Sequence, residues 1–164
     1  MPHWFAIRTS PRWEQRASNE LSQRGFETYV PLSHVKHKWS DRTKVVAVPL
    51  FPGYLFSRFL LHDRIRVLQS PGVKQVVGIG DTPAPISQSE IENLKTLVNA
   101  SPVLVPWPYL QAGERVRVDR GPLAGVQGYV VRAEEGSLRI VVSVDLLQRS
   151  VATEIDRDCI GSVG

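Results

Sequence analysis

A proline-rich segment divides the chain into two halves whose apolar residues follow different periods. Residues 101–110 (SPVLVPWPYL) carry three prolines. Each proline fixes φ and removes a backbone donor, so an extended connection of limited flexibility is expected, with its apolar residues lying partly against a domain. The sequence therefore predicts a domain at residues 1–100, a linker at 101–112 and a second domain at 113–164.

The half before the linker combines strands with amphipathic helices. An apolar run at residues 4–9 predicts a buried strand, and Ser10-Pro11 followed by apolar residues every fourth position predicts a helix that ends at Gly25. Further strands are expected at residues 26–32, 44–50 and 54–59, and a second helix at residues 87–98. This order predicts an α+β sandwich, in which helices pack on a mixed or antiparallel sheet.

No helical period follows the linker. Residues 115–118 alternate between Arg and Val, and β-rich runs occur at 129–132, 138–144 and 151–155. Short strands separated by glycine turns predict a small all-β barrel.

Charge and cysteine content restrict the partners and the compartment. Residues 1–100 have a net charge of +5 (13 Lys and Arg against 8 Asp and Glu), and residues 101–164 have −1 (7 against 8). The excess in the first half permits contact with a polyanion. No apolar run approaches the ~18 residues of a membrane span, and the N-terminus lacks the pattern of a signal peptide. The single Cys159 rules out an internal disulfide, which predicts a cytoplasmic protein. The lack of a long apolar run predicts that it has no membrane partner.

Motifs for catalysis, cofactors and metals are missing from the sequence. It contains no GxxxxGK[ST] loop, no GxSxG elbow and no HExxH helix. His34 and His37 are too few ligands for a closed metal site, because no Cys or carboxylate lies at a suitable spacing. We therefore expect no enzymatic activity, no cofactor and no metal.

Residues 113–131 (GERVRVDRGPLAGVQGYVV) resemble the KOW motif, with its strand, Gly-Pro turn and paired glycines. Gly121, Gly125 and Gly128 are expected where a tight loop enters the next strand, because glycine tolerates a positive φ. KOW domains occur in ribosomal proteins and in transcription factors, so this motif leaves both classes open.

The segment FPGYLF at residues 51–56 follows a strand, helix, strand and hairpin that begin with WFAIRT. This arrangement resembles the N-terminal domain of NusG-type transcription factors, and with the KOW motif the resemblance covers essentially the whole chain. The chain length and the segment VPLFPGYLF are similar to those of specialised paralogues of the RfaH and UpxY type. These two features do not separate the specialised paralogues securely from housekeeping NusG. The resemblance implies a NusG-type α/β sandwich followed by an SH3-like KOW barrel, and a role in transcription elongation or antitermination.

The resemblance also implies a surface for RNA polymerase. Tyr54, Phe56 and Arg58 share one face of the predicted strand, and aromatic residues occur on both faces, so both faces should be covered. The domain's own helices would cover one face, and in the family the clamp helices of the polymerase largest subunit cover the other. The expected polymerase-binding residues, around a hollow left open for the partner, are Arg8, Phe51, Tyr54 and Phe56.

A basic segment at residues 34–44 (HVKHKWSDRTK) joins two predicted strands and is too long and too polar for a tight turn. A protruding basic hairpin is suited to phosphate contact, and Trp39 to stacking on a base or sugar; a solvated charged loop is the alternative. The resemblance implies contact with the non-template DNA strand in the transcription bubble. The expected DNA-binding residues are Lys36, His37, Lys38, Trp39 and Arg42, extended by Arg12 and Arg16 on the first helix.

The second half departs from the family pattern in two places. Leu123 stands where the KOW motif commonly has an aromatic residue, and residues 146–152 keep only the Arg of the FGRxTP-type segment. In housekeeping NusG that segment meets Rho or a small-subunit ribosomal protein, so both partnerships stay open. One alternative function is an RNA- or ribosome-binding KOW module, against which the net charge of residues 101–164 counts. The other is a housekeeping factor that couples to Rho and the ribosome.

Overall fold

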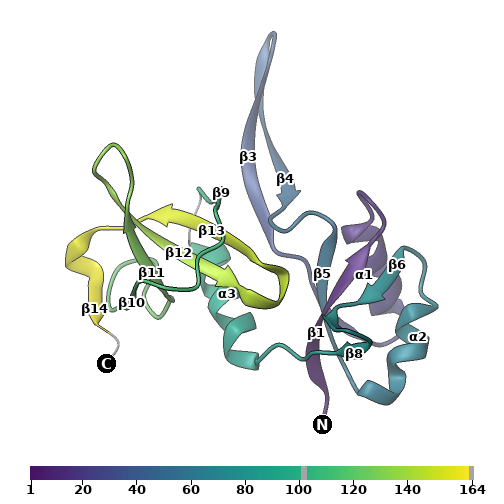
Figure 1. The fold of residues 1–164 in the computed structure, drawn as a ribbon. Coiled ribbons are helices and arrows are strands. Elements are labelled where there is room, and N and C mark those ends of the chain that lie inside the picture. Colours follow the sequence, from purple (N-terminus) through teal and green to yellow (C-terminus); the bar gives the residue numbers. More distant parts are fainter. Residues whose placement is uncertain (101–102, 163–164) are drawn as a thin grey trace. The chain divides into compact units, whose positions relative to one another are not determined.

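The computed structural model describes residues 1–100 and 103–162 and divides into two compact units (Figure 1). The first comprises residues 1–31 and 49–91, and the second comprises residues 32–48 together with the described residues from 92 onward. Residues 101–102 of the expected linker and residues 163–164 lie outside the described residues. This division differs from the expected domain boundaries, which stay a prediction.

The first unit is built on a four-stranded antiparallel sheet with the order β2-β5-β1-β6. Its strands are β1 (His3–Thr9), β2 (Glu27–Tyr29), β5 (Tyr54–Phe59) and β6 (Val73–Val76). Its helical elements are α1 (Glu14–Gln23), η1 (Leu61–Asp63) and α2 (Arg64–Leu68). The short strands β7 (Gly78–Ile79) and β8 (Thr82–Pro83) pair as a separate two-stranded sheet. The expected α+β class is confirmed, whereas α2 and β6 were missed by the sequence pattern.

One face of this sheet packs against α1 and α2. The buried cluster on that face comprises Phe5, Ile7, Ala17, Leu21, Phe26, Leu55, Phe59, Val67 and Val76. The rings of Phe5 and Phe59, from paired strands, stack with their centroids 4.6 Å apart. Burial of the side chains in this cluster that are larger than alanine, at about 1.5–3 kcal/mol each, is the main force that holds the helices on the sheet.

Helix α1 begins later than Ser10-Pro11 predicts, at Glu14 with Trp13 as the N-cap. Residues 10–12 instead form a turn, in which the Ser10 N–H donates to the Gly72 carbonyl (2.9 Å) and Arg12 adopts a φ of 66°. The helix end was predicted correctly, because Gly25 follows the C-cap with a φ of 91°. The start was wrong because a hydrogen bond to a distant loop replaces the local cap.

The second unit contains a six-stranded antiparallel sheet, which we call the C-terminal sheet, with the order β14-β10-β11-β12-β13-β9. Its strands are β9 (Val105–Trp107), β10 (Glu114–Val118), β11 (Gln127–Arg132), β12 (Leu138–Val144), β13 (Arg149–Glu154) and β14 (Ile160–Ser162). The 3₁₀ turns η2 (Asp145–Leu147) and η3 (Arg157–Cys159) lie between its later strands. The expected β-rich second half is confirmed.

Helix α3 (Gln88–Ala100) and the ribbon of β3 (Leu32–Trp39) and β4 (Arg42–Pro49) complete the structure. The N–H of Glu90 donates to the Ser87 hydroxyl (3.2 Å), as the predicted cap requires. Within the second unit, the Asn93 amide donates to the Gln127 carbonyl and accepts from the Gln127 N–H, both at 2.8 Å. This pair of hydrogen bonds holds the helix at the start of β11.

Part of the expected linker is a strand of the C-terminal sheet. Val105, Pro106 and Trp107 pair with β13, and the Thr153 hydroxyl donates to the Val103 carbonyl (2.8 Å). Proline is tolerated there because β9 is an edge strand of this sheet. The extended conformation was predicted correctly, but these residues are part of a folded sheet rather than a connection beside it.

The three KOW glycines serve two different purposes. Gly121 and Gly125 have φ values of 88° and 95°, so their predicted role in a tight loop is confirmed. Gly128 has no positive φ, and the predicted reason for it was wrong. A Cβ at Gly128 would lie 2.5 Å from the Val141 carbonyl oxygen, so glycine is required there because the backbone of β12 passes very close.

Candidate nucleic-acid interface

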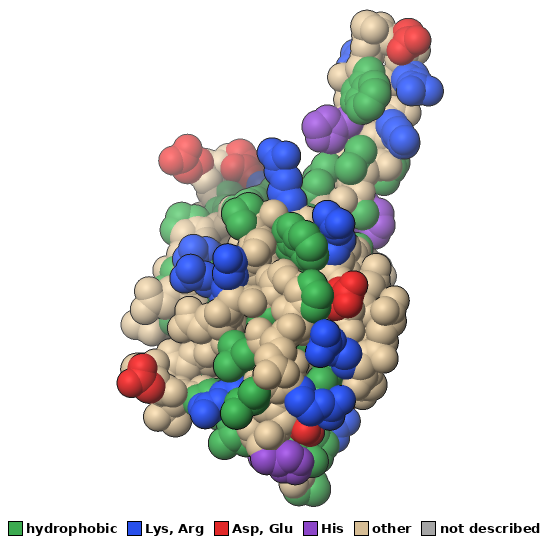
Figure 2. All heavy atoms as spheres, turned by 90° about the vertical axis from the view of Figure 1, so that its right-hand side faces the viewer, with side chains coloured by type: hydrophobic (Ala, Val, Ile, Leu, Met, Phe, Trp, Pro, Cys, Tyr) green, Lys and Arg blue, Asp and Glu red, His purple; other side chains and the backbone are tan. Residues whose placement is uncertain are grey.

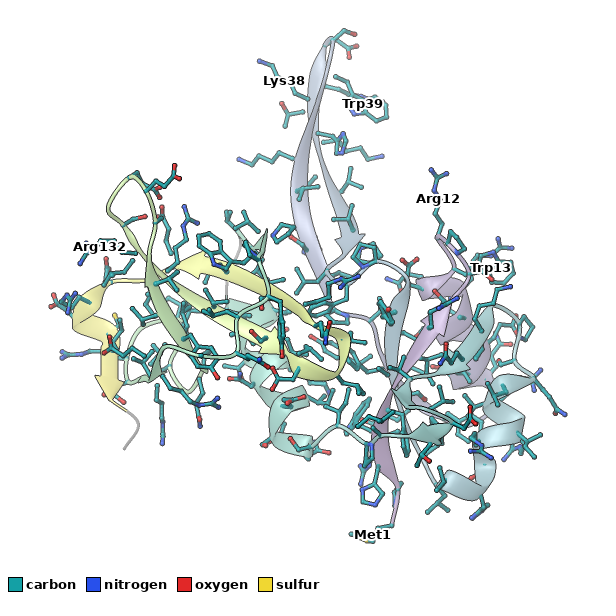
Figure 3. All side chains as sticks on the ribbon, in the orientation of Figure 1. Met1, Arg12, Trp13, Lys38, Trp39 and Arg132 are labelled. Atoms are coloured by element: carbon teal, nitrogen blue, oxygen red, sulfur yellow. The ribbon has the colours of Figure 1, made fainter. Side chains whose placement is uncertain are left out.

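The basic segment between the second and third predicted strands is itself part of a long β-ribbon (Figures 1 and 3). Strands β3 and β4 run up to Trp39 and start again at Arg42, with Ser40 and Asp41 as the turn. The expected basic hairpin is therefore present, but the expectation that the segment is too long for a tight turn was wrong. A run of β-branched residues in β4 favours the extended ribbon, although Lys and His in β3 do not.

The outer part of the ribbon places its basic and aromatic side chains in solvent. All residues from 36 to 45 are exposed, and Trp39 retains an exposed fraction of 50%. Side chains alternate along β3, so His37 and Trp39 share one face and Lys36 and Lys38 share the other. Figure 3 shows Lys38 and Trp39 on opposite sides of the ribbon.

Arginine and tryptophan meet at the end of the ribbon. The guanidinium carbon of Arg42 lies 5.7 Å from the centroid of the Trp39 ring, a cation–π distance. In residues 1–100 and 103–162, the ion pairs involve no Lys or Arg of the ribbon. Figure 2 shows blue and purple side chains along the ribbon, with acidic red only near its tip. The ribbon therefore offers uncompensated positive charge beside an exposed aromatic ring.

Arg12 and Arg16 belong to the first unit, whereas the ribbon belongs to the second. Arg12 is exposed, and the guanidinium carbon of Arg16 lies 4.2 Å from the centroid of the Trp13 ring. The expectation that these arginines extend the basic surface of the ribbon stays a prediction.

The residues expected to bind polymerase differ in accessibility. Arg8 and Tyr54 are cross-strand neighbours on β1 and β5; Arg8 is exposed and Tyr54 is half-buried. Phe51 and Phe56 have exposed fractions of 2% and 0%, and their rings meet edge to face with centroids 6.1 Å apart. The expected open hollow at these two rings was therefore wrong, because they are packed on each other.

Phe56 also stacks on Tyr29, with ring centroids 6.4 Å apart. Burial raises the pKa of Tyr29 to about 12, so the phenol stays neutral throughout the physiological range. Ala6 pairs with Phe56, and Trp4 pairs with Arg58, on the same face of the sheet. We call this face, which lies opposite the α1 and α2 helices and carries Trp4, Tyr29, Tyr54 and Phe56, the aromatic face of the first unit.

A buried carboxylate positions the Pro52-Gly53 turn. Glu14 has an exposed fraction of 5%, and its Oε2 accepts the N–H of Gly53 at 2.8 Å. The Gly53 carbonyl accepts the N–H of Thr9 at 2.8 Å, and Gly53 has a φ of 86°. Helix α1 thus holds the turn that precedes Tyr54. The sequence analysis missed Glu14. The only signal for it in the sequence is an acidic residue in the first turn of a helix, which is a common feature of helices.

An exposed apolar stripe was also missed. Leu61, Ile65 and Leu68 have exposed fractions of 53%, 62% and 39% along η1 and α2. Their spacing of four and three residues is the helical signal that would have identified them.

Within residues 1–100 and 103–162, no group of three or more His, Cys, Asp or Glu is arranged to hold a metal ion. Over the same residues, every helix is too short or too polar to cross a bilayer.

Comparison with known proteins supplies a family and a fold. Residues 2–95 match the family described as transcription termination factor nusG. A transcription termination/antitermination protein NusG of Vibrio vulnificus is 28% identical and covers 93% of this chain and 91% of its own length. The protein of the same name from Thermus thermophilus is 27% identical and covers 93% and 94%. The solved structure of Thermotoga maritima NusG matches with a TM-score of 0.59 at 18% identity, over 100% of this chain and 98% of that one, and shows a shared fold.

Proposed function

Because the chain belongs to the NusG family of transcription termination factors, we propose that it acts on transcribing RNA polymerase as an elongation or antitermination factor. Its relatives are transcription factors, and the chain is accordingly a transcription factor rather than an enzyme. In the proposed mechanism, it binds one conformation of the polymerase better than the others and thereby suppresses pausing or termination. Such an effect needs binding energy and no catalytic group.

The β3–β4 ribbon is proposed to contact the non-template DNA strand of the transcription bubble. The observation that carries this proposal is the exposed Trp39 with the Arg42 guanidinium beside it and no ion pair on the ribbon cations among the described residues. Cations that lack a protein partner attract phosphates, and an exposed indole ring stacks on an unpaired base. The exposed ring suits a single strand better than a duplex, because the bases of a duplex are already paired and stacked on one another.

Crosslinking to the non-template strand of an assembled elongation complex tests this contact. Reversal of Lys36, Lys38 and Arg42 to Glu is expected to abolish the crosslink while leaving affinity for polymerase unchanged. The matched control reverses Lys74, Arg117 and Arg120, which are also exposed and lie outside the ribbon. If the ribbon variant crosslinks as strongly as the control, the ribbon does not contact this strand.

The aromatic face of the first unit is proposed to bind the clamp helices of the polymerase largest subunit. Arg8 and Tyr54 support this proposal, since they are adjacent across β1 and β5 and remain accessible. An arginine beside a tyrosine is a frequent centre of binding energy at protein interfaces. Phe51 and Phe56 would then shape the face from beneath rather than contact the partner directly.

A pull-down with core polymerase tests the clamp contact. Arg8→Ala combined with Tyr54→Ala is expected to weaken binding at least tenfold, or about 1.4 kcal/mol, through loss of the central contacts. Ile79→Ala, at a side chain with an exposed fraction of 78%, is the control and should bind normally. Unchanged binding by the double variant would move the polymerase surface away from this face.

A further inference from the structure

A four-residue turn leads the chain into β5 at Tyr54. The Tyr54 N–H donates to the Phe51 carbonyl (3.1 Å), and Gly53 has a φ of 86°, as the third position of a type II turn requires. The Gly53 N–H takes no part in the turn's own hydrogen bond. A backbone donor of this kind costs free energy unless an acceptor reaches it. The position of Tyr54 therefore depends on the groups that hold Gly53.

Two hydrogen bonds from other segments hold Gly53. Its N–H donates to Oε2 of Glu14, and its carbonyl accepts from the Thr9 N–H, both at 2.8 Å. Glu14 is buried, and the ion pairs in residues 1–100 and 103–162 do not include it. Burial of a carboxylate without a cationic partner is costly, and the first turn of a helix offsets only part of that cost. Packing alone would favour an apolar side chain here, so the hydrogen bond to Gly53 is what the carboxylate adds.

The start of α1 is itself fixed by the loop before β6. The Ser10 N–H donates to the Gly72 carbonyl (2.9 Å). A Cβ at Gly72 would lie 2.6 Å from Cε3 of Trp13, so this ring packs directly against the Gly72 backbone. Between these two contacts Arg12 has a φ of 66°, a strained conformation that persists where the surroundings fix the chain. The carboxylate of Glu14 consequently extends from a backbone that is held in place.

We propose that Glu14 is a positioning residue for polymerase binding, which holds Gly53 and, through it, Tyr54. Tyr54 lies opposite Arg8 across β1 and β5, and Thr9, which follows Arg8, also bonds Gly53. The two accessible side chains of the aromatic face thus share one anchor. A side chain that is placed before its partner arrives loses less freedom on binding. The inference rests on the proposed function, which supplies the contact of Arg8 and Tyr54 with the clamp helices.

Affinity for core polymerase, measured with the full chain at a temperature where every variant is folded, tests this role. Glu14→Ala is expected to weaken binding about fivefold, because the turn must then be ordered at the moment of binding. Glu14→Gln keeps an oxygen that accepts the Gly53 N–H, and it should bind within about twofold of the unmodified chain. Glu14→Asp keeps the charge but is one CH₂ group too short to reach Gly53, so it should weaken binding as Glu14→Ala does.

The matched control is Ser18→Ala, which removes a different buried hydrogen bond of α1. The Ser18 hydroxyl lies 2.6 Å from the Thr28 hydroxyl, away from the turn. Both alanine variants should lower the thermal midpoint by roughly 5 °C, but only Glu14→Ala should weaken polymerase binding. A loss of stability alone does not lower affinity while nearly all molecules remain folded. In nuclear magnetic resonance spectra of the full chain, the Gly53 amide signal should shift in Glu14→Ala and stay in place in Ser18→Ala.

Combination with Tyr54→Ala identifies the side chain through which Glu14 acts. In a chain that already carries Tyr54→Ala, Glu14→Ala should weaken binding by less than about twofold, because residues that act through one contact are not additive. The positioning role is overturned if Glu14→Ala binds polymerase as tightly as Ser18→Ala, or if its effect is equally large without the Tyr54 side chain. The clamp contact still stands in both cases, provided that Arg8→Ala with Tyr54→Ala loses binding. Normal binding by that double variant overturns the clamp contact and the positioning role together.

Discussion

Replacement of Gly128 by alanine is expected to destabilise the C-terminal sheet by about 3 kcal/mol. The new Cβ would lie 2.5 Å from the Val141 carbonyl oxygen and 3.0 Å from Cγ1 of Ile140. A side chain could rotate away, but the carbonyl belongs to β12, which is paired with β11 and β13. Relief therefore requires the strands to separate, which places the loss at the upper end of overpacking effects, about 1–3 kcal/mol.

Urea unfolding of the full chain, followed by amide signals of the C-terminal sheet, measures this loss. Gly125→Asn is the control, because nothing lies within 4 Å of a Cβ at Gly125 and only its φ of 95° is unfavourable for a side chain. Asparagine is among the residues that adopt a positive φ most often, so the control should lose about 1 kcal/mol, which is less than the loss expected at Gly128. Equal losses in the two variants would mean that the loop conformation, rather than the close approach of β12, makes the glycines necessary.

A C-terminal fragment that begins at residue 113 is expected to be much less stable than one that begins at residue 103. The shorter fragment lacks β9 and leaves β13 as an unpaired edge. It also loses the hydrogen bond from Thr153 to the Val103 carbonyl and the one from the Leu110 N–H to the Ser150 hydroxyl. At about 1 kcal/mol for each net hydrogen bond, these two contacts and the β9 pairing together are worth roughly 3 kcal/mol or more.

Trp107 adds to the difference between the fragments, since the guanidinium carbon of Arg139 lies 5.7 Å from the centroid of its ring. Thermal unfolding by circular dichroism, at equal concentration, compares the two fragments. A third fragment, 103–164 with Trp107→Ala, should fall between them because it keeps the backbone pairing of β9. Equal stability of the 103 and 113 fragments would show that β9 adds nothing to the sheet, and the expected boundary at 113 would then stand.

Local patterns predicted several elements within a residue or two. The strand at residues 54–59 was predicted with its actual bounds, and its alternation correctly places Leu55 and Phe59 in the core beneath the helices. The second predicted helix corresponds to α3, with the expected cap at Ser87. These successes share a cause, because side-chain periodicity and capping depend on residues that are close in the sequence.

The candidate site was only partly predictable. A basic hairpin was predicted at the ribbon, but the continuation of its strands to a two-residue turn was not, because strand pairing across a tight turn overrides the polar character of β3. Phe51 and Phe56 were expected to be open, and whether an aromatic ring is covered depends on neighbours from other strands. Arg12 was assigned to a helix, and its strained turn became visible only with the hydrogen bond between Ser10 and Gly72.

The sequence itself determined the strands and helices that have a clear side-chain period, the glycine turns at Gly121 and Gly125, the placement of basic residues and the family motifs, because each depends on a short stretch of chain. The tertiary structure alone decided that residues 105–107 join the C-terminal sheet, that Gly128 makes room for β12, and that the Trp13 ring packs against Gly72. The physical reason is that these contacts join residues distant in sequence, and their free energy exists only once the chain has closed on itself.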